Sequence, residues 1–404
     1  MSKEYNDYIL SKIGSSAVAS ILKKEMMRQD NNVELIASEN YPSDAVMAAA
    51  GSIFCAKYTE GYPGTKNIGN KGRYYGSCQF YDELELYGVQ VFQRLFNAPD
   101  YYFNLQPHSG SNANCIAYSS VLNIGDTMLA MDMSSGSHLT HSSAASFVSK
   151  LYDVHTYGCG PDYILDYDNI KQLALNIKPK LIVCGGSAFP NEIDFRKFRK
   201  IADACGAYLM ADISHISTLC AYGLHSNPFG LCDLITFTTQ KIFRGNRGGV
   251  VACKQELAKK VDSACFPRWQ GGALQNMVAA KVIAAEEACS AEYEQYVNQV
   301  VKNAKAMRDE FAKLGYDVSP TQTHMFLIDL TNTHPQLTGK MVQDELDRNG
   351  ITLNKNTVPG ETRSPMQASG LRIGTPAMTT RGWVEQDFID CAHKIDEIIK
   401  GMIA

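Results

Sequence analysis

The chain has 404 residues, of which 45% are hydrophobic and 20% are charged, and its 38 basic and 42 acidic side chains leave a formal net charge of −4. The hydrophobic share is too high for a disordered chain. The mildly acidic balance, without any basic block, argues against a surface for nucleic acid or anionic membranes. No apolar run reaches the ~18 residues that a membrane span needs. The length predicts two or three domains.

The cysteines and histidines do not have the spacing of a metal site. Twelve cysteines are scattered without a Cys-x-x-Cys pair, and His138 and His141 lack an acidic or thiolate partner close in sequence, so no metal is expected. The first thirty residues lack the apolar core of a secretory signal. Reduced, mostly buried cysteines and a cytosolic protein are therefore expected.

Three regions differ in their hydrophobic patterns. Residues 1–40 are predicted to form a helical arm, because apolar side chains recur at helical spacing at Ile9, Ile13, Val18, Ile21 and Met26. Residues 41–285 form a predicted large domain. Residues 286–404 begin with a long helical pattern, AEYEQYVNQVVKNAKAMRDEFAKLG, and continue with shorter strands, MFLIDL, ITLNKN and LRIG, and two further helices. This pattern is typical of a smaller α+β domain.

The large domain contains seven apolar runs separated by polar, helix-like stretches. These runs are YYFNLQ, TMLAMDM, LYDVHTYG, PKLIVCGG, AYLMADIS, LITFTT and GGVVACK. Near-continuous apolar strands alternating with helices predict an α/β domain with a mostly parallel sheet, covered on both faces. Ligands of such sheets bind at the carboxyl ends of the strands.

Two charged residues follow the ends of such strands. Lys241 comes shortly after LITFTT, and a buried lysine is costly unless its amine has a use, such as a Schiff base. The alternative, that Lys241 begins a solvated loop, stays open. Asp212 ends AYLMAD and could bind the ring nitrogen of a pyridine cofactor, or it could be an ordinary strand-end cap.

The segment PHSGSNAN, residues 107–114, joins a strand to a helix. Its Ser-Gly-Ser turn offers backbone N–H groups and a helix dipole to a phosphate, although serine-rich helix caps are common. Taken with the strand-end lysine and aspartate, this turn favours a pyridoxal-phosphate enzyme.

Several blocks of sequence carry a family resemblance in their order and spacing. They are VELIASEN (33–40), KYTEGYPG (57–64), RYYGSC (73–78), QPHSGSNAN (106–114), HLTH (138–141), TT-x-K-x-x-R-G-x-R-G-G (238–249), QGG (270–272), ITLNKN (351–356) and SGLRIGTPA (369–377). With these blocks the chain resembles the serine hydroxymethyltransferase family over nearly its whole length. The resemblance implies the aspartate-aminotransferase-like fold (fold type I) and pyridoxal 5′-phosphate as cofactor.

The resemblance also implies the cofactor contacts. Lys241 would form the Schiff base, Asp212 would pair with the ring nitrogen, and His138 would stack on the ring. The other contacts would be Ser109 and Gly110 at the phosphate, Tyr58 and Gly272 from the neighbouring subunit, and Ser187 and His215 at the phenolic oxygen.

Substrate and folate contacts are implied in the same way. Arg372 would bind the substrate carboxylate through two hydrogen bonds, a task that suits a guanidinium, assisted by Ser38 and Tyr75. Glu60 would be the proton-transfer carboxylate, so that the catalytic set is Lys241, Glu60, Tyr75 and His138. With tetrahydrofolate as co-substrate, the folate contacts would be Glu60, Met133, Ser137, Leu139, Asn356 and Met366. Because Tyr58, Glu60 and Tyr75 would cross the subunit interface, a homodimer is expected as the only macromolecular partner.

The sequence departs from the family pattern at four places around the folate site. Gln240 replaces a histidine before the lysine, a position that influences substrate specificity. Ser137 puts a side chain where folate would pack on glycine, and extra residues lie within 65–72. The fourth change is that Met133 and Met366 stand in place of a leucine and a phenylalanine.

The expected reaction converts serine and tetrahydrofolate into glycine and methylenetetrahydrofolate. The departures leave open a folate-independent aldolase or transaldolase that acts on β-hydroxy amino acids such as threonine. A catalytically dead scaffold is disfavoured, because Lys241, Asp212, Glu60 and Arg372 are all present.

Overall fold

The computed structural model describes residues 2–64 and 72–403. The extra residues expected within 65–72 thus lie outside the described residues, apart from Gly72. A seven-stranded sheet with the order β2-β8-β7-β6-β5-β3-β4 forms the centre of the chain. Its strands are β2 (Tyr101–Asn104), β3 (Thr127–Met131), β4 (Asp153–Tyr157), β5 (Leu181–Cys184), β6 (Tyr208–Asp212), β7 (Leu234–Thr238) and β8 (Gly249–Lys254).

All seven strands coincide with the apolar runs of the sequence, and the expected α/β fold with a mostly parallel sheet is confirmed. Strand β8 pairs antiparallel with β2 and β7, whereas the other neighbours pair in parallel. Because side chains alternate along a strand, each strand packs on two cores. Leu209 and Ala211 of β6 belong to one hydrophobic cluster, and Met210 between them belongs to the other.

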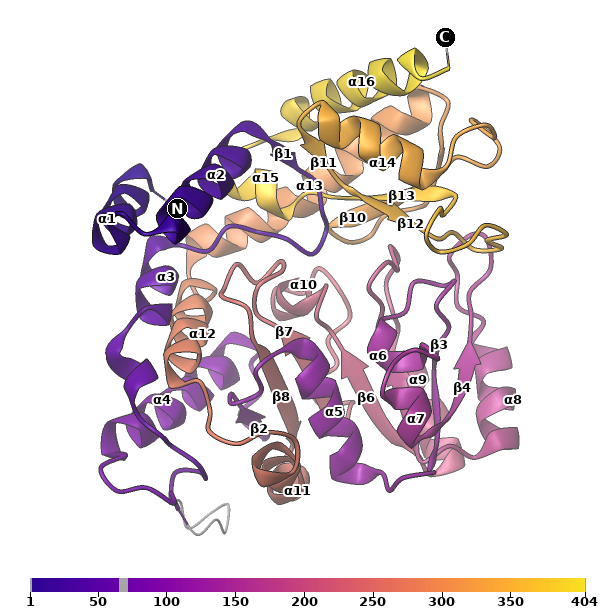
Figure 1. The fold of residues 1–404 in the computed structure, drawn as a ribbon. Coiled ribbons are helices and arrows are strands. Elements are labelled where there is room, and N and C mark those ends of the chain that lie inside the picture. Colours follow the sequence, from indigo (N-terminus) through magenta and orange to yellow (C-terminus); the bar gives the residue numbers. More distant parts are fainter. Residues whose placement is uncertain (1, 65–71, 404) are drawn as a thin grey trace.

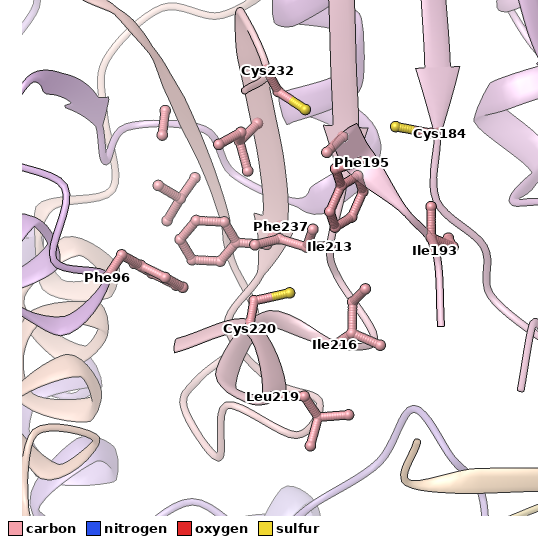
Figure 2. Close-up of a cluster of buried hydrophobic side chains, with 14 of the residues drawn as sticks. Phe96, Cys184, Ile193, Phe195, Ile213, Ile216, Leu219, Cys220, Cys232 and Phe237 are labelled. Carbon is pink, nitrogen blue, oxygen red and sulfur yellow. The ribbon is translucent and has the colours of Figure 1, made fainter. Parts of the chain in front are cut away.

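Helices cover both faces of this sheet (Figure 1). The larger cluster, part of which is drawn in Figure 2, packs on α4 (Gln79–Leu95), α8 (Tyr167–Ile177), α9 (Phe195–Cys205), α10 (Ser217–Ala221), α12 (Gln275–Glu287) and the first half of α13 (Ala291–Lys313). The other cluster packs on α5 (Gly110–Val121), α7 (Val148–Leu151), α11 (Ala258–Ser263) and the π-helical turn η3 (Ala264–Trp269). The sheet is therefore buried on both sides, as near-continuous apolar strands require.

A second, antiparallel sheet of order β12-β13-β10-β9 has its own hydrophobic cluster. Its strands are β9 (Asp317–Val318), β10 (Met325–Asp329), β12 (Asn354–Asn356) and β13 (Gly370–Gly374), and the helices that follow in this part are α14 (Gly339–Arg348), α15 (Pro376–Thr380) and α16 (Glu385–Gly401). The N-terminal strand β1 (Val33–Glu34) pairs in parallel with β11 (Ile351–Thr352). Leu35 joins this cluster, so residues close to the predicted boundary at residue 40 pack on the C-terminal part. The domain boundaries themselves stay a prediction.

The N-terminal arm consists of two helices rather than one. Helix α1 (Lys3–Ile13) ends at Gly14, whose φ of 65° stops the helix, and α2 (Ala17–Asn31) begins after Ser16. Neither helix buries a side chain. The remaining short helices are α3 (Asp44–Ala50), η1 (Ile53–Ala56), α6 (Leu139–Ser142) and η2 (Gln255–Leu257).

Two further features bear on the expected class of protein. None of the helices within 2–64 and 72–403 is both long enough and apolar enough to cross a membrane. All twelve cysteines lie in these ranges as free thiols, and most of them are buried.

Substitution of Gly374 tests how the N-terminal segment packs on β13. Gly374 N–H donates to Leu35 O at 2.9 Å, and a Cβ at this position would overlap the backbone of Ala37. We expect Gly374→Ala to lower the free energy of unfolding by about 1–3 kcal/mol, because the added methyl overpacks two backbones. Gly401→Ala is the matched control, since a Cβ there meets no atom within 4 Å. Equal stability of both variants in denaturant titrations would contradict this packing.

Candidate active site

A cavity of about 420 Å³ lies at the carboxyl ends of the parallel strands. Strands β2, β5, β6 and β7 run in the same direction, so the segments that follow them meet at one edge of the sheet. The lining combines the segments that follow β3 and these strands with residues 38–39 of the N-terminal segment and one residue of the small sheet. The lining residues are Ser38, Glu39, Ser109, Gly110, Ser111, Asn114, His138, His141, Gly186, Ser187, Asp212, Ser214, His215, Thr238, Gln240, Lys241, Arg247, Gly248 and Arg372.

Lys241 is a buried amine in this cavity. Its side chain is 8% exposed, so the alternative of a solvated loop is wrong. The backbone is held by Asn40, whose Nδ2 donates to Lys241 O at 3.0 Å. Burial lowers the pKa of Lys241 to about 8; the Asp212 carboxylate acts against this change, and Arg372 adds to it. At this pKa about a tenth of the amine is unprotonated and nucleophilic at pH 7, far more than for a lysine with the usual pKa.

Asp212 is a buried carboxylate whose two oxygens each accept two hydrogen bonds. Oδ1 accepts from the backbone N–H and the hydroxyl of Ser214, at 3.0 and 2.6 Å. Oδ2 accepts from Asn114 Nδ2 and interacts with His141 Nε2, both at 2.9 Å. Burial alone would raise the pKa of Asp212, but the hydrogen bond from His141 and the nearby positive charge lower it well below its usual range. The carboxylate is therefore charged, as a partner for a protonated ring nitrogen must be.

The sequence did not predict three of the residues that bind Asp212. They are Asn114, His141 and Ser214, which bind the carboxylate from α5, α6 and the loop after β6. His141 was considered only as a metal ligand beside His138, although its ring binds a carboxylate 71 positions away. No three His, Cys, Asp or Glu side chains of the described chain are grouped to hold a metal ion. Ser214 could have been found, because a serine two residues after a strand-end aspartate commonly binds it.

Arg372 reaches the cavity from β13. Nη1 donates to Ser187 O at 2.7 Å, and Nη2 donates to Asn354 Oδ1 at 3.0 Å. Nε is buried without a hydrogen-bond partner. Burial lowers the pKa of Arg372 to about 10, so the group remains charged at neutral pH. A buried cation with an unused donor is suited to a carboxylate ligand.

His138 and His215 of the cavity are neutral at neutral pH. Burial lowers the pKa of His138 to about 4, with the neighbouring His141 adding to the effect. Burial also lowers the pKa of His215 well below its usual value. The ring of His215 stacks on that of His324 with centroids 5.3 Å apart, and Nδ1 of His215 lies 3.2 Å from Nε2 of His324. His324 was not anticipated from the sequence.

The turn before α5 has the shape of an anion site. Ser109 caps the helix by accepting from Asn112 N–H at 3.2 Å, and the first N–H groups of a helix have no partner within it. A Cβ on Gly110 would overlap Cγ2 of Thr238, so glycine allows the close packing of this turn on β7. The expected positions of Ser109 and Gly110 beside Lys241 and Asp212 agree with this lining.

Four of the expected site residues lie together, but none of them lines this cavity. Tyr58 stacks on Tyr75 with centroids 5.3 Å apart. Gly272 packs against Tyr58 and Glu60, since a Cβ there would lie 3.3 and 3.8 Å from their side chains. Tyr58 is 63% exposed and Tyr75 is 41% exposed. We call these four residues the exposed aromatic cluster.

The other residues expected to contact folate do not line the cavity, and they differ in how exposed they are. Met133, Leu139 and Met366 are exposed, and Asn356 is half-buried on β12. The side chain of Ser137 was expected to lie in the folate site, but the structure places it elsewhere. It is buried, and its hydroxyl lies 3.4 Å from His141 Nδ1. The hydroxyl therefore contacts the far side of the histidine that binds Asp212.

A family model described as serine hydroxymethyltransferase matches residues 12–395. The chain belongs to the serine hydroxymethyltransferase family. The match spans almost the whole chain and confirms the family expected from the sequence blocks. Serine hydroxymethyltransferases are pyridoxal-phosphate-dependent transferases that act on serine and glycine in one-carbon metabolism, with tetrahydrofolate as co-substrate.

The residues of this serine hydroxymethyltransferase-family cavity fit pyridoxal phosphate. The cofactor needs an amine, a carboxylate and an anion site, which Lys241, Asp212 and the turn at Gly110 supply around one cavity. An amino-acid substrate adds a carboxylate, and Arg372 has a buried Nε without a partner. Each charged group of the ligands would thus meet an opposite charge or a hydrogen-bond donor.

The pKa of Lys241 can be measured by amine labelling of the protein without cofactor. We expect the labelling rate of Lys241 to rise with a midpoint at about pH 8, because burial disfavours the charged amine, and the exposed Lys178 is the matched control. Asp212→Asn should lower the midpoint further, because the carboxylate stabilises the ammonium form. Mass spectrometry of labelled peptides across a pH series provides the rates. A midpoint of Lys241 equal to that of Lys178 would contradict the buried amine.

Proposed function

We propose that the protein interconverts serine plus tetrahydrofolate with glycine plus 5,10-methylenetetrahydrofolate. The observation that carries this proposal is the convergence of the Lys241 amine, the Asp212 carboxylate and the Arg372 guanidinium on one cavity, in a chain matched to the family over residues 12–395. The cytosolic location expected from the cysteines is part of the same proposal.

Some polar residues of the cavity would bind the cofactor, and others would bind the substrate. Pyridoxal phosphate, when bound, would supply an aldehyde for amines and a ring that withdraws electrons from the carbon beside them. Lys241 would hold the cofactor through its amine, and Asp212 would keep a proton on the ring nitrogen. His138 and His215 would contact the ring and its phenolic oxygen as neutral groups, adding no charge that competes with Asp212.

Arg372 would orient the amino acid by its carboxylate. Two of its nitrogens already bind Ser187 and Asn354, which holds the guanidinium plane in place before a ligand arrives. Ser38 lines the same cavity and would add a hydrogen bond. A fixed guanidinium leaves less side-chain entropy to be lost on binding.

Glu60 of one subunit would act in the cavity of the other subunit, where it would transfer the proton of the substrate's hydroxymethyl group. Glu60 lies in the exposed aromatic cluster with Tyr58, Tyr75 and Gly272, away from the cavity of its own chain. Exposed aromatic side chains are typical of interfaces. A homodimer with shared sites is therefore part of the proposal, with the pterin bound near Met133, Leu139, Asn356 and Met366 and close to the partner's Glu60.

One observation favours a folate-independent aldolase as the second candidate. Gln240 lines the cavity directly before Lys241, and its Oε1 accepts weakly from Gly248 N–H at 3.4 Å. A neutral amide at this place changes the hydrogen bonds available to a β-hydroxyl group, so other β-hydroxy amino acids could be preferred. Ser137 gives no such support, because its hydroxyl is turned to His141.

The folate requirement separates the two candidates. We expect the purified protein, supplied with pyridoxal phosphate, to convert serine to glycine much faster with tetrahydrofolate than without it, because folate removes the one-carbon unit as it forms. Lys241→Ala should lose both this activity and the covalent attachment of pyridoxal phosphate by borohydride. Folate-independent cleavage of threonine, faster than that of serine, would instead establish the aldolase.

Mixed dimers test whether Glu60 acts across the interface. Glu60→Ala and Lys241→Ala should each be inactive, and exchange of subunits should restore about one quarter of the wild-type activity, since half of the dimers are mixed and each has one intact site. The matched control mixes Asp212→Ala with Lys241→Ala. Both of these residues line the same cavity, so every site keeps a defect and no activity should return. Absence of rescue in the first mixture, with exchange verified by mass, would place Glu60 and Lys241 in sites of one chain.

A further inference from the structure

Lys281 is a buried lysine on α12 that the proposed reaction does not use. Its side chain is 1% exposed, and Nζ donates to three backbone carbonyls, Leu105 O at 2.7 Å, Pro107 O at 2.8 Å and Gly249 O at 2.9 Å. An ammonium group has three N–H donors and a neutral amine has two, so the three carbonyls match the charged form. Among the described residues no carboxylate forms an ion pair with Lys281.

The three carbonyls belong to the segments that lead into the anion-binding turn. Leu105 and Pro107 follow the end of β2, four and two residues before Ser109, and Gly249 begins β8. Gly249 N–H also donates to Pro107 O at 3.1 Å, and a Cβ on Gly249 would overlap the carbonyl of Ser109. Lys281 therefore ties together the backbone on which the turn rests.

The sequence makes room for this lysine. A Cβ on Gly248 would overlap Cε of Lys281, so a larger residue would displace the side chain. Burial lowers the pKa of Lys281 to about 7, whereas the nearby Glu85 carboxylate and the three hydrogen-bonded carbonyls favour the charged form. Glu85 is itself already bound by Arg73 at 2.8 Å and by Gln275. The positive charge of Lys281 is thus left without a paired anion, beside a turn built to bind one.

We propose that Lys281 is a positioning residue for the phosphate group of the cofactor, holding the turn at Ser109 and Gly110 through the carbonyls of Leu105, Pro107 and Gly249 and adding a positive charge behind it. This inference rests on the proposed function, because it requires that the cavity binds pyridoxal phosphate. It concerns the phosphate alone and leaves the ring and the aldehyde to the residues already described.

The test compares ligands with and without a phosphate. We expect Lys281→Met to weaken binding of pyridoxal phosphate on the order of ten- to hundred-fold, as for loss of a charged hydrogen-bonding group, and to leave the affinity for pyridoxal nearly unchanged. Inorganic phosphate should raise the melting temperature of the wild-type protein without cofactor, and this effect should be lost in the variant. The matched control is Lys254→Met at the other end of β8, where the half-buried lysine binds the buried Asp233 and neither residue lines the cavity.

The possible results separate the two proposals. Equal weakening of pyridoxal phosphate and pyridoxal by Lys281→Met would show general damage to the site and overturn the inference, as would no weakening at all. Failure of the wild-type protein to bind either ligand would overturn the proposed function instead. If Lys281→Met does not fold, Gly248→Ala decides the question, because it displaces the Lys281 side chain and keeps its charge. This variant should also lose affinity for pyridoxal phosphate more than for pyridoxal, and an equal loss of both would overturn the inference.

Discussion

A carboxylate buried in a protein must have its charge balanced and its oxygens hydrogen-bonded, and Asp212 meets this constraint with four donors. Two of them, Asn114 on α5 and His141 on α6, come from the helices that shape the cavity. The same contacts that satisfy Asp212 therefore fix the turn at Ser109, which begins α5, and His138, which caps α6. The position of one charged side chain thus determines the positions of the groups around it.

Positive charge exceeds negative charge around this carboxylate. Lys241, Arg247 and Arg372 line the cavity, and Lys281 lies behind the turn that leads into α5, whereas the carboxylates of the lining are the buried Asp212 and the exposed Glu39. A ligand with a phosphate and a substrate with a carboxylate would restore the balance. Burial is the main reason why His138 and His215 are neutral at neutral pH, and the surrounding positive charge adds to this effect. The cavity is thus electrostatically suited to a phosphorylated cofactor and an amino acid.

Much of the fold and part of the site could be predicted from local sequence patterns. The seven strands were predictable because a strand buried on both faces must be apolar along its whole length. Lys241 and Asp212 stood out because a charged residue at the end of such a strand is costly. The contact of His141 with Asp212 could not be predicted, because the two residues are far apart in sequence. The break at Gly14 in the N-terminal arm was missed, because periodicity continued on both sides of it.

The sequence by itself determined the family, the order of strands and helices along the chain, and the chemical types of the site residues, because these depend on residue identity and short-range spacing. Only the tertiary structure decided which side chains meet. In the folded chain the hydroxyl of Ser137 contacts His141 and does not lie in a folate slot, and Lys281 binds the carbonyls before Ser109. Tyr58 and Glu60 do not line the cavity of their own chain. Such contacts join residues distant in sequence, and they depend on how strands and helices pack, which no local pattern encodes.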